Sequence, residues 1–308
     1  MELHKKASRT QPTPALTRFT KPATMLEEQV QLLIRRGMIF TNSDSAIERL
    51  RHVNYYRLGA YWLPYEADHD SHTFLEGTSF EDVWRHYEFD RQLRLLLLDA
   101  IERVEVSVRT HWAYFMAHHH GAHAHLDPSL GKSPHFWDRN LRHLHEEVER
   151  SAPDERFIQH HREKYAEDLP AVWVVCEVMS LGLLSKYYGN LAPSKTRNAI
   201  ARSYLLDDRL FESWLRHLTT IRNRCAHHGR VWNREFTVLP MAPHNPQALR
   251  NNWHRDNRRI YNTLLLVGNF CERIVSNSNF KSTVNELIQK FEIDTKSMGF
   301  PDDVREVQ

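Results

Sequence analysis

One uninterrupted helical pattern, from about Phe80 to Ala117, constrains the fold of this chain more than any other feature. Thr78 and Ser79 precede it, and each has an acidic residue three positions later, as at a capped helix start. A helix of about 35 residues would run roughly 50 Å at 1.5 Å per residue. Its apolar residues share one face: Trp84, Tyr87, Leu93, Leu97, Ile101, Val104, Val108, Trp112 and Phe115. We therefore expect this helix to be the spine of a helical bundle.

The composition favours helices throughout the chain. Only 10 of the 308 residues are glycine, while 41% are hydrophobic and 11% aromatic, which is typical of a globular protein. The predicted fold class is all-α. Further helices are expected over 24–37, 43–50, 53–63, 133–150, 157–165, 170–188, 194–204, 208–228, 257–274 and 282–291. A loop or short hairpin is expected over 66–79, and an extended proline-rich loop over 238–246.

Three local features carry structural expectations. Ser43 or Asp44 can cap the second helix. Glu177 lies inside the most apolar segment, 169–184, so we expect a buried carboxylate that needs a partner, because an unpaired buried charge is costly. The same charge and the short length of this segment argue against a membrane span.

The domain organisation is predicted as a loose, polar tail over 1–22, one helical domain over 23–276, and a helix with a polar end over 277–308. Residues 118–168 are predicted as an insertion in the helical domain. The three cysteines, Cys176, Cys225 and Cys271, are odd in number and widely spaced. They indicate reduced core residues of a cytoplasmic protein. No membrane partner is expected.

The segment from Ile221 to Arg234 concentrates the candidate functional residues. Apolar residues at three- and four-residue spacing predict a helix up to this point, and Gly229 is expected to end it in the left-handed conformation. Asn223 and His227 are four residues apart and share a helix face. Histidine titrates near neutral pH, and beside a permanently charged guanidinium such as that of Arg222 it suits acid–base chemistry on a phosphodiester.

Arginine is concentrated in this part of the chain although the net charge is only +2. Between residues 197 and 234 there are eight arginines and three acidic residues. Arginine binds phosphate in a bidentate manner, so RNA contact is one interpretation; a solvated helix face with ion pairs is the other. An aromatic segment, 53–65, contains Tyr56 and Arg57. It could stack bases, but packing against the bundle is the favoured reading.

The histidine-rich tract at 118–125 has five histidines in eight residues and could bind a metal. Spacing in a flexible loop fixes no coordination geometry, and no second shell is evident. We therefore predict neither a metal site nor any other cofactor.

The motif around Arg222 resembles the Abi-like proteins of the AbiD/AbiF group, bacterial abortive-infection proteins of the HEPN superfamily. The matching residues are Arg222, Asn223, Cys225, Ala226, His227, His228, Arg230, Trp232, Asn233 and Arg234. Three other stretches agree with this resemblance: 54–62, 87–103, and the residues Trp173, Glu177, Ser180, Gly182, Leu184, Ser185 and Tyr188. The resemblance covers about residues 25 to 275.

The resemblance implies an HEPN-like helical bundle with additional N-terminal and inserted helices, and a metal-independent endoribonuclease in phage defence. The family's Arg-(four to six residues)-His motif matches Arg222 with either His227 or His228. It also implies a homodimer, RNA as substrate, and a small noncoding RNA or an antitoxin as a further partner. The expected catalytic residues are Arg222, Asn223, His227 and His228, and the expected RNA-binding residues are Arg224, Arg230, Arg234, Trp232, Arg57 and Tyr56.

Two alternatives stay open at this point. The same residues could hold a structured noncoding RNA without cutting it. Arg222 and His227 could also only cap the helix and pair with Glu177 or Glu212.

Overall fold

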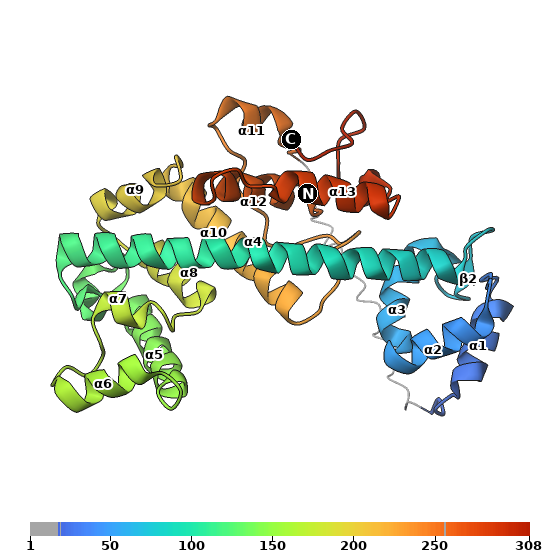
Figure 1. The fold of residues 1–308 in the computed structure, drawn as a ribbon, viewed down its shortest axis with the longest axis horizontal. Helices are drawn as coiled ribbons and strands as arrows, with labels where there is room; N and C mark the ends of the chain where they lie inside the picture. Colours follow the sequence, from blue (N-terminus) through green and yellow to red (C-terminus); the bar gives the residue numbers. More distant parts are fainter. Residues whose placement is uncertain (1–17, 19, 256) are drawn as a thin grey trace, which may run out of the picture. The chain divides into compact units, whose positions relative to one another are not determined.

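The computed structural model describes residue 18, residues 20–255 and residues 257–308, and this part of the chain is predominantly helical (Figure 1). Its only regular strands, within the described residues, form one two-stranded antiparallel hairpin. The predicted all-α fold class is confirmed. The chain separates into two compact units, residues 1–81 and residues 82–308. The predicted domain over 23–276 includes this division, and the predicted tail over 1–22 lies almost entirely outside the described residues.

The N-terminal unit contains three helices and the hairpin. Their bounds are α1 Leu26–Arg35, α2 Ser43–His52, α3 Tyr55–Trp62, the 3₁₀ turn η1 Leu63–Tyr65, β1 Glu66–Asp68 and β2 Thr73–Phe74. Gly37 ends α1 as predicted, with a left-handed φ of +96°. The cap of α2 was predicted wrongly: Asn42, not Ser43 or Asp44, accepts the backbone N–H of Ser45 at 2.9 Å. A preceding asparagine competes well for this position because its short side chain reaches the first turn.

The second unit is built along α4, Phe80–His120, whose 41 residues extend roughly 60 Å. The other elements are η2 Ala124–Leu126, η3 Pro128–Leu130, α5 Pro134–Ser151, α6 Arg156–Lys164, α7 Val172–Val175, α8 Leu181–Asn190, α9 Ser194–Arg202, α10 Asp208–Ala226, α11 Gln247–Asn252, α12 Tyr261–Ile274, α13 Phe280–Lys290 and η4 Thr295–Met298. Helices α12 and α13 lie along α4 (Figure 1), and Phe89 of α4 packs edge-on against Phe291.

The core of this unit gathers where α10 meets α8, α9 and α12. Phe270 of α12 contacts the rings of Tyr204, Phe211 and Trp214, with centroids 5.2, 6.1 and 5.8 Å away. All four side chains are almost fully buried. Aromatic packing of this kind adds specific ring geometry to the burial of large apolar areas. It fixes α10, which carries the candidate motif at its far end.

The predicted helix over 170–188 is interrupted, which the sequence analysis missed. Helix α7 ends at Val175, and α8 starts at Leu181 after an N-cap by Ser180, whose Oγ accepts the N–H of Leu183. Arg109 donates to the main-chain carbonyls of Glu177 and Met179 in the gap. The expectation of a buried Glu177 carboxylate was therefore wrong: the residue is exposed, because the chain leaves the helix there.

The C-terminal segment is packed on the second unit. Phe300 is buried, and its ring lies 4.4 Å from that of Tyr261. Asn285 of α13 accepts the N–H of Val307 at 2.8 Å. The polar end predicted after residue 291 is thus part of the folded body rather than a tail.

Candidate functional site

The end of α10 turns sharply at the motif. His228 donates its N–H to the carbonyl of Cys225 at 3.0 Å, and Gly229 donates to the carbonyl of Arg224 at 2.8 Å. These two bonds form a Schellman motif, in which the residue after the C-cap takes the left-handed conformation. That residue is His228, with φ +58°, and not Gly229 as predicted. The helix therefore ends at Ala226, two residues earlier than the predicted limit.

Gly229 nevertheless leaves space at the turn that a side chain would occupy. A Cβ atom at this position would lie 2.9 Å from Nη1 and 3.0 Å from Cγ of Arg224. The missing side chain lets the Arg224 side chain fold over the turn. The glycine thus positions an arginine, while the neighbouring histidine carries the unusual backbone angle.

A buried carboxylate fixes the segment that follows. Oδ1 of Asp90, on α4, accepts the backbone N–H of Val231 at 2.8 Å and that of Trp232 at 2.7 Å. Its Oδ2 accepts from Nε of Arg94 at 2.9 Å. The Asp90 side chain is fully buried, so these partners replace the water that a carboxylate needs. Asp90 was not among the predicted site residues, although it lies in one of the stretches that carry the family resemblance.

Trp232 lies in the core rather than on an RNA-facing surface. Only 2% of it is exposed, and its ring stacks on that of His86 at 4.3 Å. Burial lowers the pKa of His86, so this imidazole is held neutral under the tryptophan. The predicted contact of Trp232 with RNA does not fit this burial. Trp232 instead packs in the core against His86.

Arg222 faces a carboxylate that the sequence analysis did not anticipate. Its Nε lies 3.8 Å from Oε2 of Glu105 on α4, and its Nη1 donates to Oδ1 of Asn223 at 3.4 Å. Glu105 also accepts from Nη2 of Arg109 at 2.5 Å. The partners considered for Arg222 were Glu177 and Glu212. Glu177 is exposed, and Glu212 pairs with Arg197 instead.

Further arginines lie in the same segment of the chain. Arg224 and Arg234 are close enough that Arg234 contributes to a lowered pKa of Arg224, after the larger effect of burial. Arg230 and Arg234 are both half-buried in the segment after the turn. Two guanidinium groups near each other in a partly dry site favour an anion between them. Three of the predicted RNA-binding arginines thus lie in the same short segment as Arg222.

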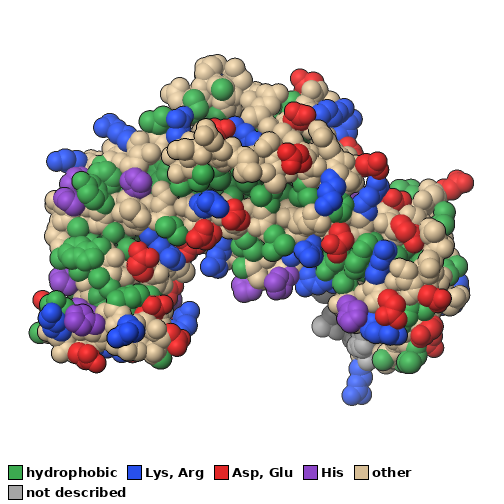
Figure 2. All heavy atoms as spheres, in the orientation of Figure 1, with side chains coloured by type: hydrophobic (Ala, Val, Ile, Leu, Met, Phe, Trp, Pro, Cys, Tyr) green, Lys and Arg blue, Asp and Glu red, His purple; other side chains and the backbone are tan. Residues whose placement is uncertain are grey.

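His227 and His228 are both exposed at the turn. The backbone N–H of His227 donates to the carbonyl of Asn223, and the His227 side chain makes no hydrogen bond to another residue among those described. Histidine and Lys or Arg side chains lie next to each other over this end of α10 (Figure 2). The imidazole of His227 is therefore accessible to a ligand.

Two of the predicted RNA-binding residues belong to the other unit. Tyr56 and Arg57 belong to α3 in the N-terminal unit, where both are exposed, Tyr56 by 80%. Burial raises the pKa of the Cys225 thiol to about 12, which makes this motif residue a packing group rather than a nucleophile.

The histidine tract is mostly engaged in the structure. Nδ1 of His119 and Nε2 of His120 each lie 2.8 Å from the Thr196 hydroxyl, and His125 is fully buried. Across the described ranges, no group of three or more His, Cys, Asp or Glu side chains is placed to hold a metal ion.

Comparison with known proteins gives one match. Residues 48–233, more than half of the chain, match the family described as Abi-like protein. No curated protein and no solved structure matches the chain significantly. Among the described residues, no helix has the length and apolar character needed to cross a membrane. The matched region contains α4, Asp90, Glu105 and the whole motif up to Asn233, and on this evidence the chain belongs to the Abi-like protein family.

Proposed function

We propose that this protein is a metal-independent endoribonuclease that acts in abortive infection, a form of phage defence. The family supports a role in abortive infection. The ribonuclease activity, the AbiD/AbiF grouping and the HEPN assignment are the parts that we add. The strongest support is the arrangement at the end of α10, where an exposed histidine follows an arginine that remains accessible to solvent.

The accessible arginine is the central observation. The side chain of Arg222 is 41% exposed, and its nearest carboxylate, on Glu105, is 3.8 Å away. That distance lies beyond the usual length of a charge-assisted hydrogen bond, so Glu105 orients the guanidinium electrostatically and leaves N–H groups for a ligand. A phosphate is the anion that best matches this fork of donors.

The proposed reaction needs only groups that the chain supplies. His227 removes the proton from a ribose 2′-hydroxyl, the 2′-oxygen attacks the adjacent phosphorus, and the bond from phosphorus to the 5′-oxygen breaks. The 5′-oxygen leaves with a proton donated by the protonated His227 of a second copy of the chain, and the products are a 2′,3′-cyclic phosphate and a 5′-hydroxyl end. Arg222 and Arg224 stabilise the additional negative charge that develops on the phosphate oxygens. Asn223, beside Arg222, contacts the phosphate or orients the imidazole.

A homodimer is part of the proposal. Five residues on an ideal helix correspond to a rotation of about 140°, so Arg222 and His227 of one chain approach one phosphate poorly from the same side. Two copies of the motif would surround the phosphate from both sides. Cleavage by a strictly monomeric protein at working concentration contradicts this part.

The proposal is tested with a labelled RNA and the purified protein. We expect cleavage that persists in EDTA and leaves 2′,3′-cyclic phosphate ends. A 2′-deoxy substitution at the scissile ribose should stop cleavage and leave binding largely intact, because the nucleophile has been removed. Binding of RNA without cleavage under all conditions would instead support a protein that holds a structured noncoding RNA. Loss of activity in EDTA that one divalent ion restores would contradict the metal-independent mechanism.

A further inference from the structure

A polar stripe runs along α10 towards the motif and is bordered by two hollows. Its residues recur at three- and four-residue spacing, which places them on one face. They are Arg209, Glu212, Ser213, Arg216, Thr219, Thr220, Asn223 and His227. The opposite face of the helix is buried in the core. The larger hollow, of about 620 Å³, lies between α5, α8 and α10, and the smaller, of about 440 Å³, lies beside the first half of the stripe.

The larger hollow has cations without partners and carboxylates that are already engaged. Arg150, Lys186 and Arg216 line it, and none has an ion pair with another residue in the described part of the chain. Glu147 accepts the backbone N–H and the hydroxyl of Ser180 at 2.9 and 2.7 Å.

Glu212 is the second engaged carboxylate. It accepts from Arg197 at 2.7 Å and lies 3.7 Å from Nζ of Lys132. Glu146, the third acidic side chain of the lining, lies 3.1 Å from Nδ1 of His143. The lining thus holds three Lys or Arg side chains and three carboxylates, and cations from outside the lining offset the charge of Glu212, so the three basic side chains face two carboxylates without a Lys or Arg partner.

The hollow leads directly to the candidate site. Asn223 is part of its lining, and Asn223 accepts the hydrogen bond from Arg222. Arg216 and His227 are eleven positions apart, which corresponds to about 16 Å along the helix axis. This distance is several times the size of one phosphate group, so an anion bound at Arg216 is not the anion that reacts at His227.

The side chains of the lining favour binding of the ribose-phosphate backbone of RNA over binding of a base. Arginine, lysine, threonine, serine and asparagine side chains are the usual contacts to phosphate and sugar. Among the lining residues there is no Phe, Tyr or Trp on which a base could stack. Binding here would consequently depend on the backbone of the nucleic acid and little on its sequence.

We infer that the hollow between α5, α8 and α10 binds the ribose-phosphate backbone of RNA on one side of the scissile phosphate. This inference rests on the proposed ribonuclease function, which it deepens by adding a length requirement. RNA that extends beyond the scissile phosphate on that side is bound through Arg216, Lys186 and Arg150. RNA too short to reach the hollow is held only at the motif.

The experiment compares short and extended RNAs in the wild-type protein, one test variant and a matched control. A minimal RNA with one cleavable phosphate is compared with RNAs that extend it by several nucleotides on either side. The test variant is the double substitution Lys186→Glu with Arg216→Glu, since both side chains are exposed and their replacement should not affect folding. The control is Arg273→Glu, an exposed arginine on α12 outside both hollows. Circular dichroism verifies that all proteins fold.

We expect one of the two extensions to raise kcat/KM of the wild-type protein by about tenfold or more, and the double variant to lose this gain while cutting the minimal RNA normally. Binding is measured with His227→Ala as the uncut background. In that background Arg216→Ala should reduce the slope of log affinity against log salt concentration by about 0.7, the value for one phosphate contact on a single strand. The control should behave as wild type in both measurements.

The outcomes separate the two ideas. Equal cleavage of short and extended RNA by wild type, or a double variant that behaves like Arg273→Glu, overturns the inference and leaves the ribonuclease proposal standing. An acidic protein as the true occupant would give this same result. In another outcome, no form of the protein cuts RNA, but extended RNA binds tightly and the double variant loses that binding. This result supports RNA binding in the hollow and contradicts the catalytic proposal.

Discussion

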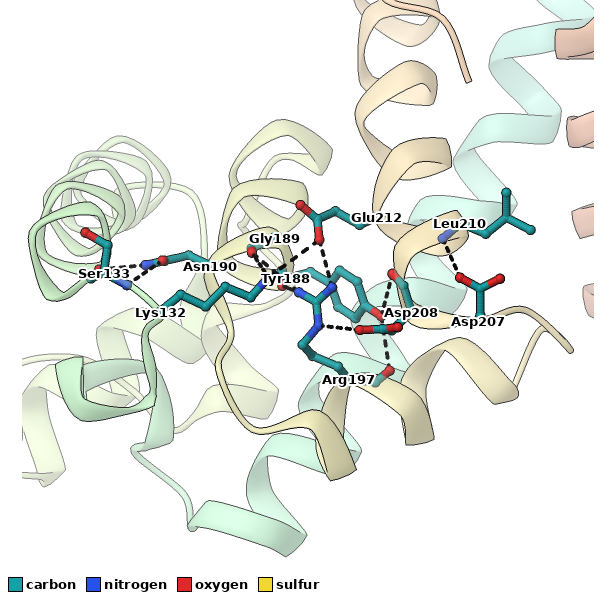
Figure 3. Close-up of polar contacts among 10 residues, drawn as sticks. All are labelled: Lys132, Ser133, Tyr188, Gly189, Asn190, Arg197, Asp207, Asp208, Leu210 and Glu212. Atoms are coloured by element: carbon teal, nitrogen blue, oxygen red, sulfur yellow. Dashed lines mark hydrogen bonds and ion pairs between the residues drawn. The ribbon is translucent and has the colours of Figure 1, made fainter. Parts of the chain in front are cut away.

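An arginine lies at each end of α10, Arg197 of α9 at its start and Arg222 of α10 itself near its end, and the surroundings of these two arginines differ. At the N-terminal end, Arg197 is only 4% exposed and donates to Asp208 at 3.0 Å and to Glu212 at 2.7 Å (Figure 3). Its Nη1 also donates to the carbonyls of Tyr188 and Gly189, at 2.8 and 3.4 Å. At the C-terminal end, Arg222 is 41% exposed, with one carboxylate at 3.8 Å.

The difference shows how a structural arginine can be distinguished from a candidate ligand-binding arginine. Arg197 donates its N–H groups to other residues of the protein, and these hydrogen bonds link α8, α9 and the start of α10. Arg222 keeps most of its donor capacity. The sequence presents both as arginines on or beside one amphipathic helix, and charge alone does not separate them.

The largest expected effect is the loss of cleavage when residues at the C-terminal end of α10 are replaced. Replacing a general acid or base typically lowers a rate by roughly 10²–10⁴-fold, so we expect His227→Ala to lose at least this much cleavage of a labelled RNA. Arg222→Ala should also abolish cleavage. It should differ from His227→Ala by weaker RNA binding, because a guanidinium holds both the substrate and the transition state. Both proteins should keep the circular dichroism spectrum of wild type. Full activity in His227→Ala and in His228→Ala would refute the assignment of this site.

The next largest effect is expected at the start of α10, where replacing Arg197 should lower the free energy of unfolding. Arg197→Ala removes the partner of two carboxylates and leaves two main-chain carbonyls without their donor. We expect a loss of about 2–4 kcal/mol in the free energy of unfolding, measured by urea denaturation. Arg222→Ala should change it by less than about 0.5 kcal/mol, as is usual for exposed positions. Equal losses in the two variants would show that the two arginines do not differ in role.

Replacing Asp90 should weaken the hold on the segment after the turn without changing a residue of the motif. In Asp90→Asn the charge is lost, and one of the two oxygens becomes an N–H₂ group that faces either Arg94 or the N–H groups of Val231 and Trp232. We expect a loss of about 2–3 kcal/mol in unfolding free energy, since a buried donor would face another donor. Cleavage should fall as well, because the segment after His228 is released. Unchanged stability together with unchanged activity would show that Asp90 does not hold this segment.

These contacts also show what could be predicted from the sequence. The limits of α10 were predicted within two residues, because an aspartate at its start and a strongly amphipathic face are local signals. The break between α7 and α8 was missed, because its residues belong to one apolar run and the competing partners, Arg109 and Glu147, come from other helices. Asp90 and Glu105 were likewise not assigned, since more than a hundred residues separate each from its partner in the motif.

Two histidines of this region also differ in burial: His217 is buried and His227 is exposed. His217, in the middle of α10, is fully enclosed, with Nδ1 2.7 Å from the carbonyl of Val238 and Nε2 2.8 Å from the Thr263 hydroxyl. Burial lowers its pKa to about 4. The unfolded chain binds this proton at a higher pH than the folded one, so stability is complete above about pH 6.5 and falls as the pH drops towards 4.

The pH dependence can be measured directly. Between pH 6 and pH 4, the unfolding free energy should fall with a contribution from His217 of at most roughly 1.4 kcal/mol per pH unit. His217→Gln should make this dependence shallower, because the titrating imidazole is removed. A parallel pH profile for wild type and His217→Gln would rule out His217 as a contributor.

The smallest expected effect concerns the residue beside the catalytic candidate. His228→Ala should lower cleavage by less than about tenfold, because this residue lies in the left-handed turn rather than on the face shared by Asn223 and His227. His228→Gly should stabilise the fold by up to about 1 kcal/mol, since glycine adopts this backbone angle without strain. An inactive His228→Ala with an active His227→Ala would exchange the roles of the two histidines.

The burial of all three thiols has a practical consequence. Cys176, Cys225 and Cys271 are each no more than 2% exposed, and burial raises their pKa values to about 12, 12 and 11. Maleimide reagents attack the thiolate, so the native protein should resist labelling at neutral pH. A cysteine introduced at the exposed Tyr56 and another at the exposed Arg273 would then be the two reactive positions. Fluorophores attached there would report the separation of the two units as RNA is added, without removal of any natural cysteine.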